Sequence, residues 1–158
     1  MDVTKTDEVE KAIKDGMDCF GRIDVLINNA GFGFSGAFEE TTDEDLRNLF
    51  ETDYFGVVNV TRRVIPLMRK RGKGVILNVS SQGGLMGFSG SSAYCAAKFA
   101  VVGLSDVLRA ELGEFGIAVS AVARVLSGPI SEASIPLGIL LQGLMPTRTA
   151  APIKPQSS

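Results

Sequence analysis

Histidine and tryptophan are absent from this sequence of 158 residues. Without an imidazole the chain cannot form a Ser-His-Asp or Cys-His catalytic site, or a metal centre with histidine ligands. The two cysteines, Cys19 and Cys95, have neither metal-ligand nor redox spacing. They are typical of small buried or half-buried thiols in a reducing compartment. We therefore expect no metal site, and acid–base chemistry falls to Tyr, Lys, Asp, Glu or Cys.

The sequence also lacks an excess of charge of one sign and a long hydrophobic run. Its 16 basic and 18 acidic residues give a formal net charge of −2 at pH 7, so there is no basic stripe for nucleic acid. The N-terminus lacks the basic-then-apolar pattern of a secretory signal. The apolar stretch at residues 135–145 is shorter than the roughly 20 residues that cross a bilayer. These features predict a cytoplasmic protein with no nucleic-acid partner and no membrane span.

Composition divides the chain near residue 124. Residues 125–158 hold five of the six prolines and only three charged side chains. We expect this tail to be irregular, with a short helix near residues 137–144. A chain of 158 residues is long enough to form one core, so we expect a single domain.

In residues 1–124 helical periodicity alternates with short, β-branched apolar runs. The patterns predict helices at 6–20, 43–71 and 92–115, and strands at 23–27, 74–79 and 117–122. Thr42 is placed to cap the second helix, and Pro66 is expected to bend it. Apolar strands separated by helices of this length indicate βαβ crossovers and a parallel sheet, hence an α/β fold.

Polar residues gather where these strands end. Asn-Asn-Ala-Gly occupies 28–31, Asn-Val-Ser-Ser occupies 78–81, and Tyr94 and Lys98 follow on the third helix. Ligands of such sheets bind at the carboxyl ends of the strands. Tyr94 and Lys98 are one helical turn apart, so both side chains rise from the same face. A phenol ionises only near pH 10, and a nearby ammonium favours its phenolate.

Each of these features also has a simpler interpretation. Tyr94 fits an amphipathic core position and Lys98 a solvated one. The segment 28–31 fits an ordinary turn that ends a strand. The combination favours a site, because Ser81 stands thirteen residues before Tyr94 at a strand end.

Together these motifs resemble the classical short-chain dehydrogenase/reductase (SDR) family. The resemblance runs from Asp2 to about Val122, and includes Tyr-Cys-Ala-Ala-Lys at 94–98 followed by Phe-Ala-Val-Val-Gly-Leu. It implies a Rossmann-like doubly wound parallel sheet that is partial, with the first βαβ unit absent. Residues 1–124 would then be the central part of an NAD(P)-binding Rossmann domain.

The resemblance implies a cofactor, NAD or NADP, and a role for each matching residue. Tyr94 would donate or accept the proton, Ser81 would position the reacting oxygen, and Lys98 would hold the nicotinamide ribose. The residues implied in cofactor binding are Asp2 and Val3 beside the adenine, Asn29, Ala30 and Gly31 beside the ribose and the central sheet, and Tyr94 with Lys98. Two hydroxyls near the reacting oxygen fit the chemistry, because hydride transfer to a carbonyl builds negative charge there. Ser80 is the rival for the role of Ser81.

Four features depart from the family pattern. The sequence has no G-x-x-x-G-x-G dinucleotide loop, and Asp53 stands where the family has asparagine. Ala123-Arg124-Val125 replaces a Pro-Gly turn that meets the nicotinamide carboxamide, and the Pro-rich tail differs from the family's last strand region.

The expected function is therefore an NAD(P)-dependent oxidoreductase that interconverts a secondary alcohol and a ketone. The segments 32–37 and 82–91 would line the pocket, and their Phe, Leu, Met and Gly content indicates an apolar substrate. The alternative is a non-catalytic SDR-like fragment or interaction protein that has lost cofactor binding. The apolar faces of the two long helices favour self-association, and the resemblance implies a homodimer or homotetramer.

Overall fold

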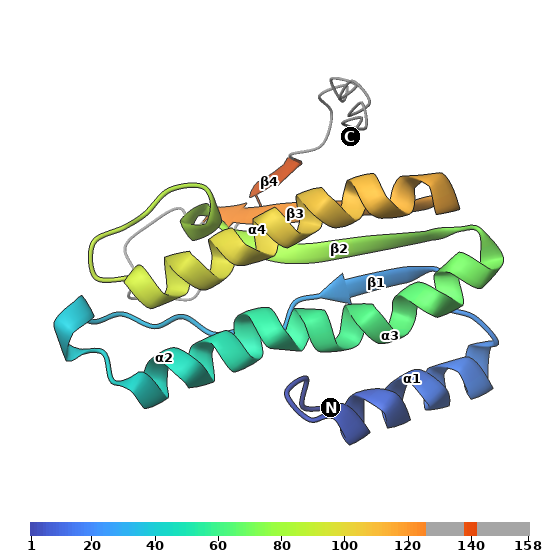
Figure 1. The fold of residues 1–158 in the computed structure, drawn as a ribbon, viewed down its shortest axis with the longest axis horizontal. Helices are drawn as coiled ribbons and strands as arrows, with labels where there is room; N and C mark the ends of the chain where they lie inside the picture. Colours follow the sequence, from blue (N-terminus) through green and yellow to red (C-terminus); the bar gives the residue numbers. More distant parts are fainter. Residues whose placement is uncertain (126–137, 142–158) are drawn as a thin grey trace, which may run out of the picture.

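The computed structural model describes residues 1–125 and 138–141 as an α/β unit (Figure 1). Its helices are α1 (Thr6–Phe20), α2 (Asp43–Phe50), α3 (Gly56–Arg71) and α4 (Ser92–Leu112). Its strands are β1 (Val25–Asn28), β2 (Gly74–Ser81), β3 (Ile117–Val125) and β4 (Gly138–Leu141). Four short helical turns complete it: η1 (Phe38–Glu40), η2 (Glu51–Phe55), η3 (Gln82–Gly84) and η4 (Gly113–Phe115). The helices and first three strands expected from the sequence are confirmed, with β2 and β3 longer than predicted.

The strands form one sheet in the order β1-β2-β3-β4. The first three strands are parallel, which confirms the crossover argument, and their register places Asn28 beside Asn78 and Ser81 beside Arg124. β4 runs antiparallel to β3. The helix expected near residues 137–144 is wrong at 138–141, because pairing with β3 supplies backbone hydrogen bonds that a single isolated helical turn does not. The rest of that expectation, and most of the predicted irregular tail, lies outside the described residues.

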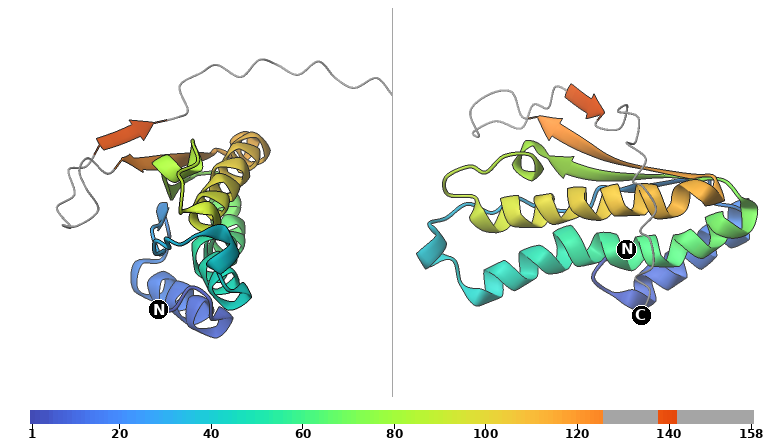
Figure 2. Two further views of the ribbon diagram at one scale, coloured as in Figure 1. Left: turned by 90° about the vertical axis from the view of Figure 1, so that its left-hand side faces the viewer. Right: turned by 45° about the horizontal axis from the view of Figure 1, so that its top comes forward.

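The described helices cover one face of the sheet (Figure 2). Residues of β2 alternate between buried and half-buried, as in a strand with one covered face. The core between helices and sheet is apolar; its fully buried members include Val9, Val64, Met68, Ile76 and Ile117. On the opposite face, the side chains of Val25 and Ile27 are 50% and 60% exposed.

The region predicted as one helix at 43–71 is interrupted in one place, by the π-helical turn η2 between α2 and α3. Pro66 lies inside α3, which continues through it. Thr42 caps α2 as expected, because its Oγ1 accepts a hydrogen bond of 3.1 Å from the Asp45 N–H. A π-helical turn changes which side chains face inward, and here it carries Asp53, which is fully buried.

No helix within residues 1–125 and 138–141 combines the length and the hydropathy needed to cross a bilayer.

Candidate active site

Tyr94 and Lys98 lie on one face of α4, as their spacing predicts. The Lys98 Nζ is 5.6 Å from the centre of the Tyr94 ring. The Lys98 side chain is buried, and its ammonium faces a second charged group, the carboxylate of Asp53. Lys98 Nζ is 3.0 Å from Asp53 Oδ2. A buried charge needs such a partner, since an unpaired one carries a large desolvation cost.

Asp53 joins three parts of the site. Its Oδ1 accepts a hydrogen bond of 3.0 Å from the Phe32 N–H, in the loop after β1. A Cβ on Gly31 would lie 3.0 Å from both carboxylate oxygens, so this position requires glycine or a shift of Asp53. Oδ2 faces the Lys98 ammonium as an ion pair without an aligned hydrogen bond. The carboxylate thus ties the loop after β1 to α4.

The two serines at the end of β2 have different partners. The Ser80 hydroxyl donates a hydrogen bond of 3.2 Å to the Lys98 carbonyl oxygen. The Ser81 Oγ accepts a bond of 3.2 Å from the Gly83 N–H, which leaves its own O–H available as a donor. Gly83 in turn approaches the tyrosine, because a Cβ there would lie 3.2 Å from Tyr94 Cε1. Ser81, Gly83 and Tyr94 therefore form one contiguous cluster.

A pocket of about 150 Å³ opens at the carboxyl ends of the strands. It brings together four of the predicted residues, Asn29, Gly31, Tyr94 and Lys98. The other lining residues are Phe32, Gly33, Val79, Ser80 and Arg124. From the sequence, Arg124 stands out only as a departure from a family pattern. Its place just after the predicted third strand at 117–122 was the available signal, because residues that follow parallel strands gather at one edge of a sheet. The register that sets it beside Ser81 came from the structure.

A second pocket, of about 300 Å³, lies along β1. Val3, Asn29 and Ala30 line it, together with apolar residues of β1 and α3. Asn29 lines both pockets, so the two adjoin at the end of β1. Asp2 is not among the residues that line either of these two pockets.

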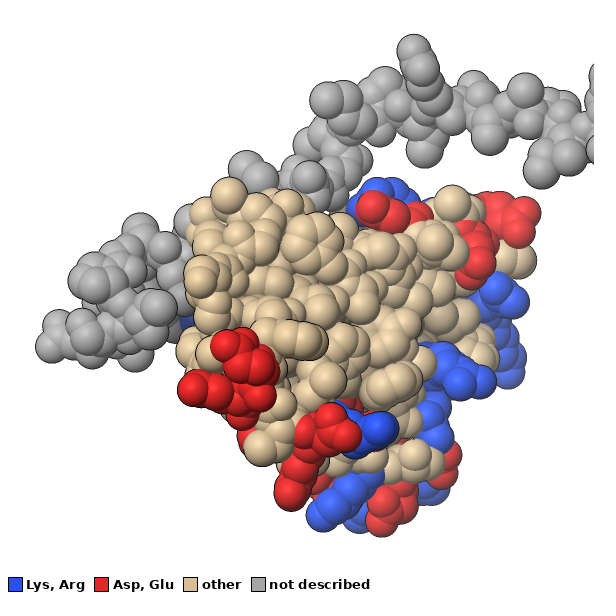
Figure 3. Space-filling view, turned by 60° about the vertical axis from the view of Figure 1, so that its left-hand side comes forward, with Lys and Arg blue, Asp and Glu red and all other residues tan. Residues whose placement is uncertain are grey.

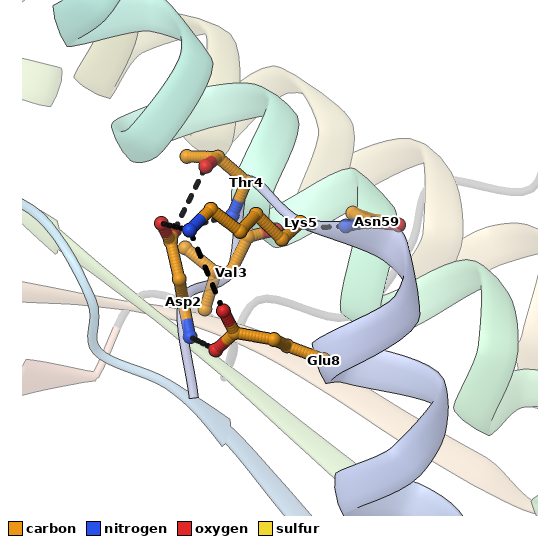
Figure 4. Close-up of polar contacts among 6 residues, drawn as sticks. All are labelled: Asp2, Val3, Thr4, Lys5, Glu8 and Asn59. Atoms are coloured by element: carbon orange, nitrogen blue, oxygen red, sulfur yellow. Dashed lines mark hydrogen bonds and ion pairs between the residues drawn. The ribbon is translucent and has the colours of Figure 1, made fainter.

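The side chain of Asp2 is engaged at the start of α1 instead (Figure 4). Its Oδ1 accepts hydrogen bonds from the Thr4 N–H at 3.0 Å and from the Thr4 hydroxyl at 2.8 Å. These bonds, with a smaller contribution from the Lys5 ammonium, lower the pKa of Asp2. The Asp2 N–H donates to Glu8 Oε2 at 2.8 Å. The carboxylate therefore stabilises the turn that leads into α1.

A buried chain of polar side chains lies beneath the site. Asn28 Nδ2 donates to Thr61 Oγ1 at 2.9 Å and to Asn78 Oδ1 at 2.7 Å. Asn78 Nδ2 donates to Ser105 Oγ at 2.9 Å, and Ser105 Oγ donates to the Val101 carbonyl oxygen at 2.7 Å. The chain links α3, β1, β2 and α4. The roles of Thr61 and Ser105 could not be predicted from the sequence, because a lone hydroxyl on a helix carries no pattern.

The family model described as short chain dehydrogenase matches residues 1–128. The chain belongs to the short chain dehydrogenase family. A 3-ketodihydrosphingosine reductase of Bacteroides thetaiotaomicron is 45% identical over 122 residues, which cover 77% of this chain and 45% of the relative. A 3-dehydrosphinganine reductase of Danio rerio is 40% identical over 121 residues, which cover 76% of this chain and 36% of the relative.

Solved structures of short-chain dehydrogenases are also similar to this chain. A short-chain dehydrogenase from Streptomyces avermitilis is 45% identical with a TM-score of 0.73, covering 78% of this chain and 44% of the other. The structure of ElxO with NADP bound is 36% identical with a TM-score of 0.77, and the match covers 80% of this chain and 51% of ElxO. The chain therefore spans about half the length of the relatives it matches. The match confirms the resemblance and the Rossmann-like fold that were predicted from the motifs.

Proposed function

We propose that this chain carries the catalytic part of an NAD(P)-dependent oxidoreductase that interconverts a secondary alcohol and a ketone. One observation carries the proposal: Ser81 and Tyr94 lie in one cluster with Gly83, and the Lys98 ammonium lies 5.6 Å from the Tyr94 ring centre. Tyr94 exchanges the proton with the substrate oxygen. Ser81 donates a hydrogen bond to that oxygen through its free O–H, and the Lys98 ammonium stabilises negative charge that develops there.

The residues present fit one end of a nicotinamide dinucleotide. Asn29 belongs to both adjoining pockets, and Tyr94 and Lys98 supply polar groups to one of them. We assign to cofactor binding Asp2, Val3, Asn29, Ala30, Gly31, Tyr94 and Lys98, of which all but Asp2 line one of the two pockets. When bound, the cofactor supplies or accepts the hydride. The solved relative ElxO holds NADP and a xylitol dehydrogenase holds NAD+, which supports either form here.

An apolar substrate suits the loops beside the site. Phe32, Met86 and Phe88 are 45%, 51% and 42% exposed. These residues belong to the segments 32–37 and 82–91. The two segments meet where the Gly36 N–H donates a hydrogen bond of 2.9 Å to the Gly90 carbonyl oxygen. Figure 3, which turns the left-hand end of Figure 1 toward the viewer, shows a broad area without charged side chains. An apolar alcohol or ketone would find its contacts there.

The test pairs cofactor binding with turnover. Fluorescence of NADH and NADPH is titrated with this chain, and turnover is measured in a chimera in which the chain replaces the matching 122 residues of the Bacteroides reductase. Tyr94→Phe should lower turnover about 100-fold or more, because it removes the proton donor, while cofactor binding persists.

Tyr54→Phe is the matched control, since Tyr54 is the other tyrosine of the chain and packs edge-to-face on Phe55. It should keep its turnover. Full turnover of Tyr94→Phe would overturn the catalytic assignment. A chain and chimera that both fail to bind either nucleotide would favour the alternative, an interaction protein of this fold.

A further inference from the structure

The small pocket at the strand ends contains an uncompensated positive charge. Two cationic side chains line it, Lys98 and Arg124, and none of its lining residues is acidic. The Lys98 charge is balanced by Asp53 at 3.0 Å. No such partner balances Arg124: its Nε is buried and has no hydrogen-bond partner in the described structure. The charges of Lys98, Asp53 and Arg124 sum to +1. Because Lys98 and Asp53 balance each other, the remaining positive charge is that of the Arg124 guanidinium.

A guanidinium in this state is prepared to bind an anion. A buried donor without a partner costs free energy that a ligand acceptor restores. The guanidinium is planar, and two of its N–H groups can donate in parallel to the two oxygens of a carboxylate. Such hydrogen bonds are stronger than those between neutral groups, because donor and acceptor carry opposite charges. Asn29 and Ser80 add polar groups to the wall. The volume of about 150 Å³ suits a small group rather than a whole large ligand.

We propose that this pocket binds an oxyanion group, the carboxylate of the substrate, with Arg124 as the residue that selects it. The pocket is shared with Tyr94, so the anion lies close to the reacting oxygen. The exposed phenylalanines beside it then contact the apolar remainder of the molecule. The substrate class becomes an alcohol or ketone that carries both an apolar body and a carboxylate. The claim that the anion belongs to a substrate rests on the proposed function, whereas the anion site itself does not.

The first experiment titrates the full chain with three probes: acetate, inorganic phosphate and neutral nicotinamide. Binding is followed by calorimetry and by the NMR signal of the arginine Nε–H groups. We expect acetate to bind and to move one buried Nε–H signal. Phosphate binding without acetate binding would place the group on the cofactor and overturn the substrate assignment. Nicotinamide binding with no response to either anion would overturn the anion site.

The second experiment uses charge variants. Arg124→Gln should weaken acetate binding about tenfold to a hundredfold, the loss expected for a charge-assisted hydrogen bond. Arg47→Gln, the same change at an exposed position of α2, should leave binding unchanged. Equal acetate affinity of Arg124→Gln and the unmodified chain would overturn the proposal.

Asp53→Asn provides an independent variant with the opposite expected sign. It leaves both cations of the pocket uncompensated, so acetate should bind more tightly than to the unmodified chain. Unchanged or weaker binding would contradict the charge argument, even if Arg124→Gln failed to fold. None of these measurements needs turnover. A chain that binds acetate through Arg124 but lacks oxidoreductase activity would overturn the proposed function and leave the anion site standing.

Discussion

Single residues determine how strongly the cation at the site acts. Lys98 lies beside Tyr94, but its ammonium also faces Asp53, a carboxylate where the family pattern has an amide. The Asp53 charge offsets part of the field of the ammonium at the reacting oxygen. The sequence identified all three residues. The burial of Lys98 and Asp53, and the 3.0 Å between their charged groups, came only from the fold.

Replacing Asp53 by asparagine should therefore raise turnover in the chimera. The amide oxygen can still accept from the Phe32 N–H, while the negative charge is removed and the ammonium acts at full strength on the developing negative charge. Turnover is measured at acidic, neutral and alkaline pH, with Asp106→Asn on the exposed side of α4 as the control. Unchanged or reduced turnover would mean that the site is adapted to the carboxylate.

At the scale of elements, α4 carries Tyr94 and Lys98 at its start and is fixed further along by Ser105. The Ser105 hydroxyl is the partner of Asn78 on β2, and both side chains are fully buried. This contact sets the position of the helix over the strand whose end carries Ser81. Apolar periodicity in the sequence predicts which face of α4 turns toward the sheet. It does not predict how far along β2 the helix lies, because that position depends on contacts such as the one between Ser105 and Asn78.

Ser105→Ala should lower the free energy of unfolding by about 1 to 3 kcal/mol, because it leaves the Asn78 amide without its acceptor in the interior. Urea unfolding of the full chain measures the change. Ser92→Ala, at the exposed first residue of α4, should stay within about 0.5 kcal/mol. Equal effects of the two substitutions would show that the buried bond contributes nothing specific.

A second contact between elements should depend on pH. Arg71 at the end of α3 donates to Asp24 Oδ1, just before β1, at 2.8 Å. That hydrogen bond is the largest cause lowering the pKa of Asp24, with further contributions from the Arg22 and Arg71 charges. The group therefore stabilises the fold above the ordinary carboxyl pKa of about 3.8, and this stabilisation is lost as the pH falls through the lower pKa of the folded state.

The measurement compares urea midpoints of Asp24→Asn and the unmodified chain at neutral pH and below pH 3. The difference should be present at neutral pH and shrink in acid. Glu114→Gln, at an exposed carboxylate that forms no ion pair within the described residues, controls for the general effect of removing charge. A difference that stays constant with pH would contradict the role of the ion pair.

At the scale of the whole molecule, the helices cover one sheet face and leave the other with exposed apolar side chains. Most of the helical positions that favoured self-association are used inside the chain, since Val57, Val60, Val64, Val101 and Leu112 are buried. What remains outside on α4 is a stripe at four-residue spacing: Phe99 at 46% exposure, Gly103, and Val107 at 54%. A glycine between two apolar residues allows a second helix to approach closely.

We expect the chain to self-associate through this stripe, with the same surface used on both copies. Val107→Glu should shift sedimentation velocity profiles toward the monomer, because it places charges opposite each other in the interface. The matched control is Val25→Glu, at 50% exposure on the sheet face that the described helices do not cover. If only Val25→Glu dissociates the oligomer, the sheet face is the interface, and a monomer at every concentration would contradict association altogether.

The sequence by itself determined the alternation of helices and strands, the parallel sheet and the family. These follow from local patterns: apolar periodicity, strand-ending turns, and the four-residue step from Tyr94 to Lys98. Only the tertiary structure decided which polar side chains meet. The π-helical turn directs Asp53 to Lys98, the register sets Arg124 beside Ser81, and antiparallel pairing makes 138–141 a strand. Such contacts join residues far apart in the chain, and their energies depend on burial that no local pattern specifies.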